Sequence, residues 1–429
     1  MAENGAAGTG SESALVRRLG LGDAVVIGLG AMIGAGIFAA LGPAARAAGA
    51  GLLLGLAIAA ALACCNAISS ARLAVRYPAS GGTYVYGRER LGPFWGYLAG
   101  WSFVVGKTAS CAAMALTVGT YVWPEHARVV AVLAVAVLTA VNYRGVRKSA
   151  RLTRVIVAVV LLVLGAVVAF SVGSGRIAVQ YMGFDASVTV AGVLQAAGLL
   201  FFAFAGYARV ATLGEEVRDP ARTIPRAIPL ALGGTLVVYA AVGVAALGVL
   251  GPDRLAAAAA PLVAVAHAAG AGWLAPVVRA GAAVAALGAL LTLILGVSRT
   301  TLAMARDHHL PRGLAAVHPR FGVPHRAEVV VGVVVALAAA TTDLRAVIGF
   351  SSFGVLLYYA IANAAALTLT RAENRPPRAI PAAGLLGCLV LACTLPVTSI
   401  ATAAALIVLG VLGYAVRSRL LPRDPATDG

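Results

Sequence analysis

Charged residues are scarce in this sequence. They make up 11% of its 429 residues, whereas 61% of the residues are hydrophobic and the mean hydropathy is +0.92. A soluble domain of this length exposes far more charge, so the composition excludes that class. Long apolar runs separated by short loops satisfy their backbone polar groups in lipid only as helices. We therefore expect an all-α polytopic membrane protein surrounded by the lipid bilayer.

Catalytic and metal-binding groups are also sparse. All five cysteines fall in apolar runs, which indicates neither a disulfide framework nor a metal site. The apolar runs hold no combination of nucleophile, base and metal ligands, so an enzyme embedded in the membrane is disfavoured. The sequence therefore predicts no catalytic residue, no metal and no cofactor. The cysteines are Cys64, Cys65, Cys111, Cys388 and Cys393.

Acidic residues are outnumbered by basic ones, 16 to 33, which gives a formal net charge of +17. A strongly basic chain can bind nucleic acid, but here the arginines lie in short loops between apolar runs. They concentrate in the N-terminal tail, in every second hairpin loop and in the C-terminal tail, as the positive-inside rule describes. This distribution predicts no nucleic-acid partner, a place in the cytoplasmic (inner) membrane, and both termini in the cytoplasm.

The apolar runs predict about 12 transmembrane helices. We divide the chain into a cytoplasmic tail (1–20), five spans (21–173), five further spans (189–371), two additional spans (379–416) and a second cytoplasmic tail (417–429). The expected spans run approximately over 23–45, 50–75, 94–122, 128–144, 154–173, 189–213, 227–250, 274–300, 327–342, 346–371, 379–396 and 398–416.

Glycines interrupt the first span near its middle. Gly30, Gly34 and Gly36 lie close together, and each costs a helix about 1 kcal/mol relative to alanine. Unwound backbone inside a membrane is tolerated only where it lines a cavity or is buried in protein, so these glycines predict a broken helix. The half-helix that begins near Gly36 would point its positive dipole end at a carboxylate. Close packing of two helices is the alternative reading of the same residues.

The sixth span is interrupted in a similar way, by Gly206. Spans one and six are the first members of two groups of five. Interrupted segments in corresponding positions of two halves indicate the binding site of a transporter built from inverted repeats. This correspondence favours a substrate site at the two breaks over simple helix packing.

Four motifs resemble those of the amino acid–polyamine–organocation permeases. They are Gly-Ala-Gly-Ile-Phe at 34–38, Tyr-Pro-Ala-Ser-Gly-Gly-Thr-Tyr at 77–84, the acidic and proline-containing loop at 215–228, and Met-Ala-Arg-Asp at 304–307 followed by Leu-Pro. The resemblance covers nearly the whole chain. It implies the five-plus-five inverted-repeat fold of the leucine-transporter type, with broken helices 1 and 6 and two extra helices. It also implies transport of amino acids by alternating access.

The same resemblance implies positions for the substrate. The carboxylate would lie on backbone amides around Ala35, Gly36 and Ile37. The amine would face the backbone carbonyls of Met32 and Ile33 in span one and of Phe202 and Ala205 in span six. Phe202 matches the position of an aromatic lid over the substrate, although ordinary packing is an alternative role for this side chain. The expected substrate-binding set is Met32, Ile33, Gly34, Ala35, Gly36, Ile37, Phe202, Ala205 and Gly206, with Thr108 and Thr292 as weaker candidates.

Two departures from the family pattern bear on mechanism. Family members that carry cationic amino acids often have an acidic residue just after the glycine of span six, where this chain has Ala208, and no aspartate or glutamate occurs in the middle of any span. A cationic side chain would therefore be desolvated without a partner, which favours neutral substrates. Some members also have a lysine in span five, whereas the matching region here, 157–161, is wholly apolar.

Two cations remain inside spans, where ionisable groups are costly and usually functional. Lys107 lies near the middle of span three, and burial would favour loss of its proton. It is our candidate for coupling to protons; contact with a substrate carboxylate or with backbone carbonyls is the alternative. Arg209 lies two helical turns before Glu216 on the same helix face. We expect this pair, together with Phe202, to act in gating.

The sequence thus predicts a secondary active transporter for amino acids, with a neutral substrate and a proton, or else sodium, as the coupling ion. An exchanger, or a carrier of amines or of acidic or cationic amino acids, remains an alternative on the same fold. A non-transporting membrane protein is a remote alternative. The sequence leaves the oligomeric state open.

Overall fold

The computed structural model describes residues 19–77, 81–145, 150–183, 188–207 and 217–420. These residues form a bundle of helices and contain no strand beyond one isolated bridge between Leu19 and Val217. In chain order the α-helices are α1 (Leu21–Met32), α2 (Ala35–Ala48), α3 (Leu52–Arg76), α4 (Thr83–Leu91), α5 (Pro93–Val122), α6 (Ala127–Tyr143), α7 (Ala150–Gly173), α8 (Val190–Phe204), α10 (Pro220–Ala257), α11 (Pro261–Ala268), α12 (Ala275–Arg306), α13 (His325–Thr341), α14 (Leu344–Leu367), α15 (Ala379–Thr394) and α16 (Val397–Leu420).

The all-α membrane architecture is confirmed. Eight helical segments among the described residues are long and apolar enough to cross a membrane, and α1, α8 and α15 are shorter apolar helices. The first of the eight segments includes both α2 and α3, and several expected spans are shortened by breaks or by undescribed residues. The count of twelve spans and the inverted repeat therefore stay predictions.

The break expected in the first span is present. Helix α1 ends at Met32 and α2 begins at Ala35, so Ile33 and Gly34 form a two-residue link with non-helical backbone angles. Helix α8 likewise ends at Phe204, and residues 205–207 form a turn just where Gly206 predicts an interruption. The chain from 208 to 216 lies outside the described residues.

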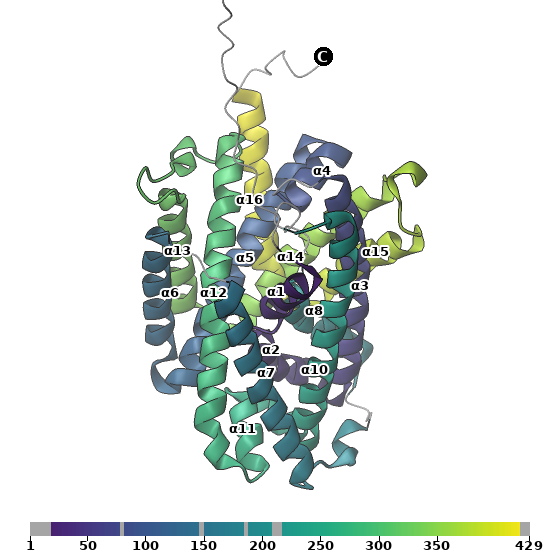
Figure 1. The fold of residues 1–429 in the computed structure, drawn as a ribbon, viewed down its shortest axis with the longest axis vertical. Helices are drawn as coiled ribbons and strands as arrows, with labels where there is room; N and C mark the ends of the chain where they lie inside the picture. The colour runs from purple at the N-terminus through teal and green to yellow at the C-terminus, as the bar shows by residue number, and fades with distance from the viewer. Residues whose placement is uncertain (1–18, 78–80, 146–149, 184–187, 208–216, 421–429) are drawn as a thin grey trace, which may run out of the picture.

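The broken segments lie in the middle of the bundle. Figure 1 shows α1, α2 and α8 surrounded by the longer helices, and α8 packs against both α2 and α3. Helix α5 runs alongside α12 and α14, and α1 packs against α10. One end of the bundle carries α4 and two short 3₁₀ helices, η5 (Arg312–Ala315) and η6 (Arg371–Glu373); we call it the arginine-rich end.

Candidate functional site

The two breaks lie directly against each other. A Cβ atom added at Gly36 would stand 2.7 Å from both the Cα and the Cβ of Ala203 in α8. A Cβ added at Gly206 would stand 2.1 Å from the backbone oxygen of Ala31 at the end of α1. These glycines therefore permit a backbone approach that no larger residue permits. The close helix packing given as the alternative role of these glycines is therefore present, and a substrate site at the breaks stays a prediction.

The N-terminus of α2 faces this junction without a side-chain cap. Gly34 is the N-cap residue, and it has no side chain that could bond to the first amides of the helix. The first amides of a helix have no partner within the helix, and they carry the positive end of its dipole. Those amides belong to the segment of Ala35, Gly36 and Ile37. Chemically, this is an arrangement that can receive a carboxylate.

Met32, the last residue of α1, has its carbonyl oxygen already engaged. The Tyr239 hydroxyl of α10 lies 2.6 Å from this oxygen and 3.2 Å from the carbonyl oxygen of Ala203, so its single proton can serve either one. The ring of Tyr239 is fully buried and packs edge-on against Phe204. Sequence reasoning missed Tyr239, because a tyrosine within an apolar run carries no signal of its partner 207 residues away.

Lys107 reaches the other break. Its side chain is only 7% exposed, and its Nζ donates to the carbonyl oxygen of Ala205 at 3.3 Å. The hydroxyl of Tyr359 in α14 donates to the same oxygen at 3.4 Å. A carbonyl oxygen has two lone pairs, so both are occupied in this conformation. A substrate amine can reach this carbonyl only after Lys107 or Tyr359 moves.

Most of the remaining site candidates are buried, whereas Gly206 is partly exposed. The side chains of Met32, Ile33, Ala35, Ile37 and Ala205 are at most 3% exposed, and Phe202 is 7% exposed. Among the described residues, the side chains at the two breaks are thus packed against one another.

Two hydroxyl candidates bond within their own helices. Thr108 donates to Val104 at 2.7 Å, and the hydroxyl of Thr292 lies 2.9 Å from the carbonyl oxygen of Ala289. Such local bonds are the usual state of hydroxyls in apolar helices. Arg209 and Glu216, the expected gating pair, lie outside the described residues.

Contacts between distant loops hold the arginine-rich end together. Asp23 of α1 pairs with Arg154 of α7, and the backbone amide of Arg218 donates to Leu19 at 2.9 Å. These contacts tie the start of the first span to span five and to the segment after span six. They thus anchor the N-terminal end of α1.

A second group of contacts joins the loops around α4 at this end. The Tyr84 hydroxyl donates to Asp307, and burial raises the pKa of Tyr84. Arg90 pairs with Glu373 in η6 and holds the pKa of that carboxyl well below its usual value. The contacts connect α4 to the loops that follow α12 and α14, so opening this end requires them to break or move together.

Glu328 is a buried carboxyl that the sequence analysis passed over, because it stands at the start of a span rather than in its middle. It is 0% exposed, and its Oε2 accepts from the Ser298 hydroxyl of α12 at 2.8 Å. The side chain of Asn142 in α6 lies beside the same carboxyl and donates to the carbonyl oxygen of Leu291 at 3.1 Å. Glu328 thus connects α6, α12 and α13.

We expect Glu328→Leu to lower the stability of the folded protein by about 1–3 kcal/mol, because buried polar partners lose their acceptor. Glu328→Gln should cost less, since the amide keeps an oxygen that can accept from Ser298. Thermal unfolding of the detergent-solubilised protein measures the effect. Glu125→Leu, at an exposed position in the loop before α6, is the matched control. Equal unfolding temperatures for Glu328→Leu and wild type would refute the structural role.

Comparison with known proteins gives a family match and several named relatives. The sequence matches the family described as amino acid permease over residues 19–418. It is 71% identical over 414 residues to an uncharacterized transporter of Mycobacterium tuberculosis, covering 96% of this chain and 94% of that protein. It is 28% identical over 452 residues to the branched-chain amino acid permease BcaP of Bacillus subtilis, covering 96% and 95%.

Another relative has a different named substrate class. The chain is 29% identical over 372 residues to the chloroplastic cationic amino acid transporter 7 of Arabidopsis thaliana, covering 80% of this chain and 64% of that protein. All three relatives are named as transporters or permeases, and none as an enzyme. The family match extends over both breaks and nearly all described helices. The chain therefore belongs to the amino acid permease family of the amino acid–polyamine–organocation superfamily and is a membrane transporter, not an enzyme.

Proposed function

We propose that this transporter moves neutral amino acids across the cytoplasmic membrane by alternating access, coupled to protons. The observation that carries the proposal is the uncapped N-terminus of α2 at Gly34, which faces the end of α8 within a closed junction. A helix N-terminus is suited to bind an anion such as the α-carboxylate, which all amino acids carry. Because the described side chains at the breaks are buried, a substrate site there would have to open to each face in turn, as alternating access requires.

The preference for neutral substrates rests on charge. Glu328, the buried carboxyl at the arginine-rich end, accepts a hydrogen bond from Ser298. It therefore contributes to helix packing rather than to binding of a substrate. Lys107 adds a cation to the junction itself. The described residues at the junction include no opposing carboxylate, so a substrate with a cationic side chain would meet this positive charge at a high desolvation cost. The branched-chain permease among the relatives supports the same class. Carriers of cationic or acidic amino acids or of amines, and exchangers, are the alternatives.

We expect alanine, serine, threonine or the branched-chain amino acids to compete for uptake more strongly than arginine or lysine. The physical reason is the absence of a mid-span carboxylate that would pair with a cationic side chain. Competition against a transported labelled amino acid in proteoliposomes measures this preference. Micromolar competition by arginine, with alanine and leucine inert, would overturn the substrate assignment.

The orientation of the protein in the membrane follows from the positive charge at the arginine-rich end. We place this end, and with it both termini, in the cytoplasm. In a protein whose five native cysteines are replaced, Ala315→Cys in η5 should be shielded from impermeant thiol reagents outside intact cells. Ser174→Cys, just after α7 at the opposite end, should react. The reverse labelling pattern would show that the protein is inverted relative to this proposal.

A further inference from the structure

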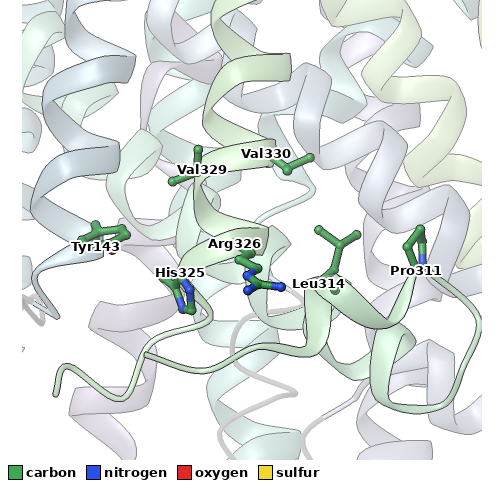
Figure 2. A pocket seen from close by; sticks show the side chains of 8 residues that line it. Tyr143, Pro311, Leu314, His325, Arg326, Val329 and Val330 are labelled. Atoms are coloured by element: carbon green, nitrogen blue, oxygen red, sulfur yellow. The ribbon is translucent and has the colours of Figure 1, made fainter. Parts of the chain in front are cut away.

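A groove opens at the arginine-rich end, away from the helix breaks. It lies where the end of α6 meets the start of α13 and the loop that contains η5 (Figure 2). Its volume is about 520 Å³. The residues that matter for its chemistry are Tyr143, Leu314, His325, Arg326, Val329 and Val330.

The polar part of the groove is cationic. Arg326 is exposed, and in the described part of the chain it forms no ion pair. Its guanidinium lies beside Gly313, within 3.7 Å of where a Cβ on that glycine would stand. The neighbouring His325 has a buried Nδ1 with no hydrogen-bond partner among the described residues. The described residues that line the groove include no acidic side chain, so the site suits an anion that accepts several hydrogen bonds.

The apolar part of the groove continues along α13. Val329 and Val330 line it and are 45% and 46% exposed. Val333 and Leu337 follow Val329 at intervals of four residues and are 53% and 60% exposed, so the three side chains form one outward stripe. In a membrane protein, such a stripe faces acyl chains rather than water. The groove therefore has a cationic mouth and an apolar wall that leads into the bilayer.

We propose that this groove binds an anionic phospholipid, with the headgroup phosphate on Arg326 and His325 and an acyl chain along Val329, Val333 and Leu337. Basic pockets between transmembrane helices at the membrane surface are suited to such headgroups. Tyr143, at the end of α6, adds an amphipathic ring at the level where tyrosines sit at membrane interfaces. A free phosphate would contact only the cationic part of the groove, whereas a phospholipid would contact both the cationic part and the apolar part. This site is independent of the proposed transport function.

Lipid binding is measured by native mass spectrometry of the detergent-purified protein during titration with phosphatidylglycerol and with phosphatidylcholine. The wild type should bind phosphatidylglycerol more tightly. Arg326→Gln should weaken that binding about fivefold to tenfold, the effect of one arginine near an anionic headgroup. Val330→Trp, which fills the groove without changing charge, should also weaken it. Arg378→Gln, an exposed arginine in another loop at the same end, is the control and should bind as wild type does.

Thermal unfolding of each variant shows whether it is folded, so loss of lipid binding can be assigned to the groove. Equal binding of the two lipids, or wild-type binding by both Arg326→Gln and Val330→Trp, would overturn the proposal. Displacement of the lipid by low concentrations of inorganic phosphate would also overturn it, because it would show an anion site that does not recognise lipid.

Discussion

We expect the Gly36→Leu protein to insert into the membrane but to bind and transport no amino acid above background. Gly36 stands at the N-terminus of α2, and a Cβ there would come 2.7 Å from the backbone of Ala203. A leucine would fill the junction and push α2 away from α8. The amides that are proposed to hold the substrate carboxylate would then lose their position. Equilibrium binding of a labelled amino acid to purified protein measures the loss.

Gly165→Leu is the matched control for this change. Gly165 lies in α7 on an exposed face, and no atom would come within 4 Å of its added Cβ. The control should therefore bind and transport as the wild type does. The unfolding temperature of Gly36→Leu must be measured as well, because a variant that fails to fold says nothing about the site. A folded Gly36→Leu protein with wild-type affinity would contradict the assignment of the substrate carboxylate.

Replacing Lys107 should separate exchange from accumulation. Lys107→Ala and Lys107→Gln are expected to keep substrate exchange but to lose accumulation driven by an inward proton gradient. Burial disfavours the charged form of a lysine, and Lys107 bonds to Ala205 at the end of α8. Gain and loss of its proton would therefore strengthen and weaken the hydrogen bond between Lys107 of α5 and the Ala205 carbonyl at the break in span six. This link between protonation and helix position is what proton coupling requires.

The alternative role for Lys107 gives a different result. If Lys107 only anchors the carbonyl of Ala205 or holds a substrate carboxylate, both variants lose substrate affinity at every pH. Thr120→Ala is the control on the same helix, because its hydroxyl bonds to Leu116 and lies away from the break. Accumulation against a gradient by Lys107→Ala, with unchanged pH dependence, would show that Lys107 carries no proton.

The breaks in the helices could be predicted because their cause is local. Unwound backbone inside a membrane is tolerated only where it lines a cavity or is buried in protein. A cluster of glycines at mid-span is a local signal of such a break, and Gly34 and Gly206 lie within or next to the non-helical segments, whereas an isolated glycine such as Gly165 stays helical. The all-α membrane class followed from composition for the same reason. Neither inference required knowledge of which helices are neighbours.

The partners of the site residues could not be predicted, because they depend on packing between distant segments. The Ala205 carbonyl meets Lys107 from 98 residues away and Tyr359 from 154 residues away. Glu328 looks in sequence like an acidic residue at the edge of a loop, yet it is completely buried. Its neighbours come from α6 and α12. The residues next to position 328 in the sequence give no indication that these helices pack around it.

The central claim, proton-coupled transport of neutral amino acids, is tested most directly by uptake into liposomes that contain the purified protein. A panel of labelled amino acids is offered with and without an inward proton gradient, and protein-free liposomes serve as the control. We predict saturable uptake of alanine, serine, threonine or branched-chain amino acids, with accumulation only when the gradient is present. Uptake of none of these amino acids, or accumulation that a proton gradient does not affect, would contradict the account.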